Sequence, residues 1–132
     1  MIAEDDPEIR KLFKKILTEN GYETVEAIDG EEVLSIYDTL EVKPNLIILD
    51  YRMPRFNGIE VIKEILQRDP TTSILMISGD PQIDHTFIAD QGIKFKSKPV
   101  RMDEFLSEIR NFAQVWSILW GNGMDHSLGG LL

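Results

Sequence analysis

The hydrophobic pattern of the chain centres on residues 46–49, four consecutive apolar residues that end abruptly at Asp50. Because Pro44 and Pro54 bound this region and proline interrupts regular structure, the run predicts a short strand buried on both faces. Asp50 then lies at the carboxyl end of that strand, the edge of an open α/β sheet at which ligands bind. A single aspartate that ends a strand is usually structural, so a functional interpretation requires other polar groups at the same edge.

Four further segments have the pattern of strands. Residues 74–78 form a second apolar run that ends in a polar residue, whereas residues 22–28 alternate between apolar and polar side chains, as an edge strand does. Residues 1–3 and 93–96 predict two short strands. Together with residues 46–49, these segments predict five strands in all.

Between the strands, apolar residues recur at helical spacing. The first helix is predicted to begin at Pro7, with Asp6 as its N-cap, and to end at Gly21. A weaker helix is predicted for residues 81–91, and the last helix is predicted to begin at Asp103. The inward positions expected in the last helix are Leu106, Ile109, Phe112, Ala113 and Trp116. A strand followed by a helix, repeated five times, predicts an α/β fold with a parallel sheet, right-handed crossovers and helices on both faces.

The composition narrows the classes of function. The 132 residues fit one domain, and a net charge of −9 argues against direct nucleic-acid binding, because phosphate recognition needs a basic face. The chain has no cysteine, which excludes disulfides and thiolate chemistry. Its apolar runs fall short of the roughly 20 residues that span a bilayer, and acidic residues from Glu4 onward argue against a signal peptide. We therefore expect a cytoplasmic protein without a membrane partner.

Polar residues follow four of the five predicted strands, and these residues are Glu4, Asp5, Asp50, Ser78 and Lys98. Because the carboxyl ends of parallel strands meet at one edge, we expect these side chains to gather there. Three carboxylates repel one another unless a cation joins them, and oxygen-only ligands suit Mg²⁺. A bound cation and the lysine ammonium together could hold a compact anionic group such as phosphoryl.

In their order and spacing, these motifs resemble the receiver domain of two-component response regulators. The motifs are Glu4-Asp5, Asp50 with Met53-Pro54 and Gly58, Ser78-Gly79, and Lys98-Pro99. The resemblance covers about residues 1–115 and implies a flavodoxin-like, doubly wound five-stranded parallel sheet of strand order 2-1-3-4-5.

The resemblance also implies how a phosphoryl group is held and sensed. Asp50 looks like the phospho-acceptor, Ser78 would hydrogen-bond the phosphoryl group and Lys98 would neutralise its charge. Phe95 matches the aromatic switch position that turns inward on phosphorylation, and Ser78 takes part in the same switch. The Lys98-Pro99 peptide bond is expected to be cis, as in the family.

The Mg²⁺ site implied by the resemblance includes the Asp50 carboxylate and the backbone carbonyl of Arg52. Asp5 would be a direct ligand and Glu4 an indirect one, through water, which leaves Asp6 free to cap the first helix. Arg52 and Asp80 carry opposite charges in the loops beside the acceptor. In the family, these two positions influence how fast the phosphoryl group is lost.

We therefore predict a stand-alone response regulator that takes phosphoryl from a sensor histidine kinase or a phosphotransfer protein and signals to a separate output protein. It would be a signalling module that catalyses only its own phosphorylation and dephosphorylation. An alternative is an aspartate-nucleophile phosphatase of the haloacid-dehalogenase type, which needs a second aspartate where this chain has Arg52. A flavin mononucleotide carrier would need a Ser/Thr/Gly-rich loop after the first strand, where this chain has acidic residues.

The end of the chain has too many apolar residues for one helix face. We predict a receiver domain over residues 1–120 and a tail over residues 121–132. Ile118, Leu119 and Trp120 cannot all face inward. Either the tail covers them, or they form an interface for a homodimer or an output protein, with tryptophan as an anchor.

Overall fold

The computed structural model describes the backbone of residues 1–120 and the side chains of residues 1–115. Five parallel strands form one sheet in the order β2-β1-β3-β4-β5, as predicted. Strands and helices alternate along the chain: β1 Ile2–Ala3, α1 Pro7–Glu19, β2 Glu26–Ala27, α2 Gly30–Thr39, β3 Leu46–Leu49, α3 Gly58–Arg68, β4 Ser73–Ser78, α4 His85–Asp90, β5 Lys94–Ser97 and α5 Met102–Trp120.

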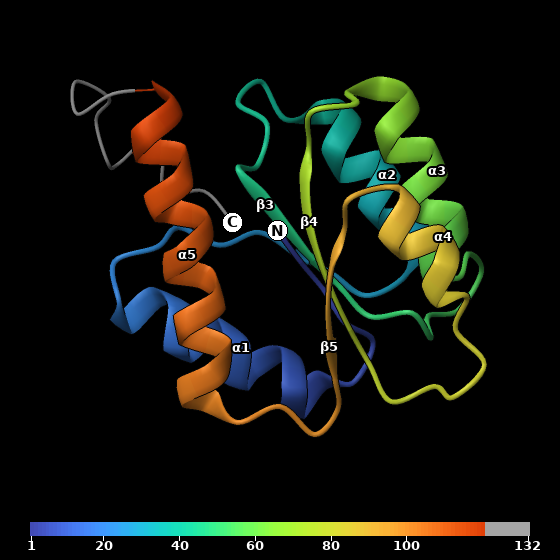
Figure 1. Ribbon diagram of the computed structural model, residues 1–132, viewed down its shortest axis with the longest axis horizontal. Coiled ribbons are helices and arrows are strands. Elements are labelled where there is room, and N and C mark those ends of the chain that lie inside the picture. Colours follow the sequence, from blue (N-terminus) through green and yellow to red (C-terminus); the bar gives the residue numbers. More distant parts are fainter. Residues whose placement is uncertain (121–132) are drawn as a thin grey trace.

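Helices cover both faces of the sheet, with α1 and α5 on one face and α2, α3 and α4 on the other (Figure 1). Because strand side chains alternate, β3 supplies both layers: Ile48 packs towards α1 and α5, and Ile47 packs towards α2 and α3. All four residues of β3 are buried, which confirms the prediction from its unbroken apolar run. The sheet is therefore the middle layer of three, and its carboxyl edge is left open for a site.

Side-chain caps fix where several helices begin. Asp6 caps α1 as predicted, since its Oδ1 accepts hydrogen bonds from the backbone N–H groups of Glu8 and Ile9. Asn57 caps α3 and Asp84 caps α4 in the same way. These caps place the helices that follow β1, β3 and β4 directly against the carboxyl edge of the sheet.

Two elements are much shorter than the sequence predicts. The strand predicted for residues 22–28 pairs only over Glu26–Ala27, because its partner β1 offers just two residues. The helix predicted for residues 81–91 begins at His85. Before it, Asp80 accepts a hydrogen bond from the Gln82 N–H at 2.8 Å, and this local bond holds a turn in place of a helix.

The inward face of α5 also differs from the predicted one. Phe105, which was not among the predicted core residues, is fully buried and stacks on Phe13 of α1 with ring centroids 4.4 Å apart. Ala113, which was predicted to face inward, is exposed. The helix begins one residue earlier than predicted, and its buried stripe passes through Phe105 and Ile109.

Over residues 1–120, no helix combines the length and the apolar character required to cross a membrane. The predictions about the side chains of Trp116, Ile118, Leu119 and Trp120, and about a tail that covers the last three, lie outside the described side chains and residues.

Candidate phospho-acceptor and metal site

Asp50 leaves the sheet at the carboxyl end of β3 and is 7% exposed. Its backbone N–H donates to the carbonyl of Ala3 at 3.0 Å, which fixes it beside β1. The loop that follows returns close to the acidic residue, where Gly58 lies against the backbone. A Cβ at Gly58 would come within 2.8 Å of Tyr51 Cα and 3.2 Å of the Asp50 carbonyl oxygen. Glycine therefore allows the start of α3 to pack directly behind Asp50.

Glu4 and Asp5, just beyond β1, bring two more carboxylates to this edge. One ligand oxygen from each of Glu4, Asp5 and Asp50 lies within 4.8 Å of the other two. Glu4 is buried and Asp5 is exposed. Arg10 of α1 donates from Nη1 to the Glu4 carbonyl at 2.9 Å, which holds the turn that carries both acids. This contact of Arg10 was not predicted from the sequence.

Lys98 reaches the same edge from the residue after β5. Its Nζ lies 2.7 Å from Glu4 Oε1 and 3.2 Å from Asp50 Oδ2, so one ammonium bridges two buried carboxylates. Its backbone N–H donates to the Ser78 carbonyl at 3.0 Å, which ties β5 to the end of β4. The Lys98–Pro99 peptide bond is cis, as the resemblance implies.

Burial and the crowding of like charges both show in the pKa values. Burial raises the pKa of Glu4 above its ordinary 4.5, the hydrogen bond from Lys98 opposes this, and the contact with Asp50 raises it further. Partial burial, followed by the hydrogen bond and charge of Glu4, raises the pKa of Asp5 above 3.8. Burial alone would lower the pKa of Lys98, but its bonds to the carboxylates outweigh burial and the net direction is upward. Burial and like-charge contacts therefore disfavour the charged forms of Glu4 and Asp5 even with Lys98 in place.

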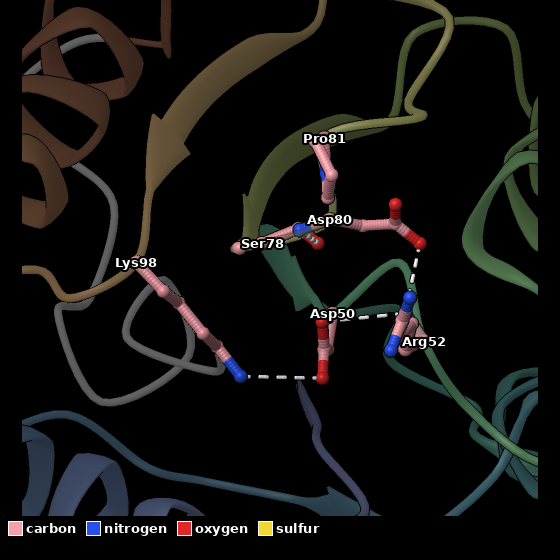
Figure 2. Close-up of a pocket in the computed structure, with 7 residues that line it drawn as sticks. Asp50, Arg52, Ser78, Asp80, Pro81 and Lys98 are labelled. Carbon is pink, nitrogen blue, oxygen red and sulfur yellow. Dashed lines mark hydrogen bonds and ion pairs between the residues drawn. The ribbon is translucent and has the colours of Figure 1, made fainter.

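Figure 2 shows Lys98 approaching Asp50 from one side and Arg52 lying on the other. Arg52 Nε lies 2.8 Å from Asp80 Oδ2, so the two charged loop residues noted in the sequence do meet. The Asp80 N–H in turn donates to Ser78 Oγ at 3.1 Å. A pocket of about 330 Å³ opens between these groups, and its lining residues are Asp50, Arg52, Ser78, Gly79, Asp80, Pro81 and Lys98.

Phe95 is placed apart from the other predicted residues. It lies in β5 opposite Met76 of β4, is half-buried, and is not among the residues that line the described pocket. Its ring packs on the core cluster of the α2–α4 face and against the ring of His85. The contact between His85 and Phe95 was not predicted, because nothing in local sequence spacing links His85 to β5.

The donor set at this edge fits a divalent cation. Glu4, Asp5 and Asp50 offer carboxylate oxygens only, which are the ligands that Mg²⁺ prefers. The raised pKa values of Glu4 and Asp5 reflect burial and contacts between like charges, which a bound cation would offset. The backbone N–H of Arg52 donates to Asp50 Oδ1 at 3.3 Å, so this residue lies beside the carboxylates. The pocket next to them has the charged groups needed to bind a small oxyanion.

The fold and this site define a doubly wound α/β protein with an acidic centre at the carboxyl edge of its sheet. The chain belongs to the response regulator receiver domain family, whose family model matches residues 1–110.

Relatives and solved structures support this membership. The chemotaxis protein CheY of Thermotoga maritima is 39% identical over 80 residues, which are 60% of this chain and 65% of that protein. CheY of Listeria monocytogenes is 32% identical over 119 residues, covering 86% of this chain and 97% of that protein. The crystal structure of a CheY-like receiver domain protein from Methanospirillum hungatei JF-1 gives a TM-score of 0.77 at 27% identity and covers 83% of this chain and 88% of that one.

The chain thus spans just under two thirds of the first of these relatives and nearly the whole of the second. The resemblance predicted from the sequence is confirmed, and so is the flavodoxin-like fold. The alternative of an aspartate-nucleophile phosphatase finds no support in these comparisons.

Proposed function

We propose that the chain accepts a phosphoryl group on Asp50 from the phosphohistidine of a sensor histidine kinase or a phosphotransfer protein. The observation that carries this proposal is the surroundings of Asp50. Its carboxylate belongs to the group of three whose ligand atoms lie within 4.8 Å, and it lies 3.2 Å from the Lys98 ammonium beside an open pocket. Membership in the receiver family supports the same assignment.

In the proposed transfer, an Asp50 carboxylate oxygen attacks the phosphorus. The P–N bond to the donor imidazole breaks, and the imidazole nitrogen keeps the electron pair and takes up a proton. Lys98 and the Ser78 hydroxyl face the phosphoryl oxygens and stabilise their charge. Hydrolysis follows when water attacks the phosphorus and the P–O bond to Asp50 breaks, which regenerates the carboxylate and releases inorganic phosphate. The chain then acts as a signalling module that turns over only its own phosphoryl group.

We assign the Mg²⁺ site to Asp5, Asp50 and the backbone carbonyl of Arg52, with Glu4 acting through water. A bound Mg²⁺ would supply the positive charge that lets an anionic phosphoryl group approach three carboxylates. Lys98 lies on the side of Asp50 opposite to Arg52 (Figure 2), where it binds the carboxylates of Glu4 and Asp50. The pocket lies next to these groups and leaves room for the donor to enter.

Signalling would follow from two residues, Ser78 and Phe95. When Ser78 turns its hydroxyl towards the phosphoryl group, the loop after β4 moves and Phe95 turns inward, so that a partner output protein reads the altered face. We assign these steps to residues 1–120 and treat residues 121–132 as a tail. Self-association through Trp120 stays a prediction.

Phosphorylation with a small phosphodonor and Mg²⁺, followed by intact mass spectrometry, tests the assignment. The wild type should gain the mass of one phosphoryl group, and Asp50→Asn should gain none, because an amide is not a nucleophile here. Asp6→Asn is a matched control within the same acidic region, since Asp6 caps α1 and should leave labelling unchanged. Full labelling of Asp50→Asn would contradict the proposal.

A further inference from the structure

The ring of Phe95 has an aromatic neighbour on a different element. The His85 and Phe95 rings lie with centroids 4.9 Å apart and planes at 88°, an edge-to-face pair. His85 is the first residue of α4, and Phe95 lies in β5. We propose that His85 is a positioning residue that holds the Phe95 ring in its unphosphorylated place. This inference rests on the proposed role of Phe95 as the switch.

The surroundings of the His85–Phe95 pair allow this contact to break when Phe95 moves. Phe95 is half-buried, with part of its ring on the core cluster of the α2–α4 face, while His85 is exposed. Moving Phe95 away from His85 therefore breaks an aromatic contact that lies at the surface. A contact of this kind can bias the position of a ring without locking it.

The chain between the phospho-acceptor pocket and His85 is short and tied by local bonds. Ser78 ends β4, and only residues 79–84 separate it from α4. The Asp80 N–H donates to Ser78 Oγ at 3.1 Å, and the Gln82 N–H donates to Asp80 Oδ1 at 2.8 Å. Buried Ile83 anchors the end of this loop. A turn of Ser78 towards a phosphoryl group would break the first of these bonds, and the loop would carry the displacement to His85.

The energetic consequence is a bias in a two-state equilibrium. If the pair exists only in the unphosphorylated state, it stabilises that state and must weaken binding of any phosphoryl analogue by the same factor. Aromatic pairs measured in proteins correspond to a factor of about 2 to 10. Removing His85 should therefore tighten binding of beryllofluoride, a phosphoryl analogue, by about 2- to 10-fold.

The direct test is NMR of the His85 ring in the full chain. Without ligand, the His85 ring protons should carry a ring-current shift from Phe95, which Phe95→Leu removes. Beryllofluoride with Mg²⁺ should remove most of the same shift in the wild type. Titrations should then give tighter beryllofluoride binding for His85→Ala and near wild-type binding for His85→Phe, which keeps an aromatic ring. Thr86→Ala, an exposed neighbour in α4, is the matched control and should bind as the wild type does.

The outcomes separate this inference from the proposed function. If the amide signals of Asp50 and Gly79 respond to beryllofluoride while the His85 ring shift stays, the positioning role is wrong and the phospho-acceptor assignment stands. Unchanged affinity in His85→Ala would overturn the positioning role in the same way. If no amide signal responds to beryllofluoride and Mg²⁺, the proposed function fails, and the inference falls with it.

Discussion

Lys98 and Arg52 lie on opposite sides of Asp50 (Figure 2), and each takes part in an ion pair. On one side, Lys98 binds Glu4 at 2.7 Å, and the two side chains are 24% and 3% exposed. On the other side, Arg52 binds Asp80 at 2.8 Å, and the two side chains are 74% and 7% exposed. The distances are nearly equal and both carboxylates are largely buried, so the pairs differ mainly in the exposure of the cation.

The difference in burial sets what each pair can contribute. Charges taken out of water must keep their partners, because an unpaired buried charge is far more costly than an exposed one. A pair whose cation lies mostly in water contributes less net stability, since water and salt screen the interaction. The Glu4–Lys98 pair is therefore a fixed part of the edge, whereas the Arg52–Asp80 pair can open and close beside the loop that carries Ser78.

Removal of Lys98 should have the largest effect on stability. Lys98→Met leaves Glu4 and Asp50 facing each other without a cation, and in chelator at neutral pH it should lower the free energy of unfolding by about 2 kcal/mol. This is less than the roughly 3–5 kcal/mol of a fully buried pair, because Lys98 is partly exposed. Urea denaturation measures the change.

Lys96→Met is the matched control for that comparison. Lys96 is two residues away in β5 and pairs with Glu108 of α5 at 3.4 Å, outside the pocket. Its loss should be clearly smaller. Equal losses from the two variants would mean that the carboxylates at the edge do not depend on Lys98.

Magnesium should stabilise the folded protein by mass action, because it would bind the acidic group that contains Glu4, Asp5 and Asp50. At a free Mg²⁺ concentration of 100 times the dissociation constant, binding raises the free energy of unfolding by about 2.7 kcal/mol. Asp5→Asn should remove most of this increment, whereas Asp6→Asn should retain it, because asparagine caps a helix about as well as aspartate. Thermal melts with and without Mg²⁺ give both numbers, and an essential Asp6 would shift the acidic pair by one residue.

In the presence of a chelator, the stability contributed by Glu4 and the stability contributed by Asp80 should change with pH in opposite directions. The folded state raises the pKa of Glu4, so its contribution to stability is present below pH 4.5 and is lost as the pH rises through the folded pKa. Hydrogen bonds from Arg52 and the Gln82 N–H lower the pKa of Asp80, so its contribution is present above pH 3.8 and is lost as the pH falls through the folded pKa.

Variants at Glu4 and Asp80 separate the two pH dependences of stability. Relative to Glu4→Gln, the wild type should lose stability as the pH rises above 4.5. Relative to Asp80→Asn, it should lose stability as the pH falls below 3.8. Urea midpoints across a pH series measure both differences, and slopes of the same sign would contradict the contrast between the two pairs.

Loss of the Arg52–Asp80 pair, whose cation is exposed, should have the smallest effect on stability and a visible effect on the lifetime of phosphorylated Asp50. Arg52→Ala should leave the urea midpoint nearly unchanged but open that side of the pocket to water, which shortens the lifetime of phosphorylated Asp50 by less than about tenfold. Intact mass followed over time after donor removal measures the decay. Arg55→Ala is the control, because Arg55 is an exposed arginine of the same loop that pairs with Glu31 instead. The same decay in both variants would count against a role for Arg52.

Much of the fold could be predicted because its signals are local. The buried run of residues 46–49, the cap at Asp6 and the polar residues at the strand ends all express neighbouring chemistry, so the parallel sheet and the position of Asp50 followed from them. The lengths of β2 and α4 could not be predicted in the same way. β2 ends where its partner β1 ends, and α4 begins only after the Asp80 turn is complete.

The sequence by itself determined which side chains meet at the carboxyl edge, because parallel strands bring their ends together whatever packs around them. Only the tertiary structure decided which of those side chains pair with one another and how deeply each pair is buried. Lys98 lies 94 residues from Glu4, yet it binds that carboxylate more closely than it binds Asp50. The His85 ring meets Phe95 for a similar reason: both contacts depend on how helices and strands distant in sequence pack, and burial, which sets the strength of each contact, is a property of the whole fold.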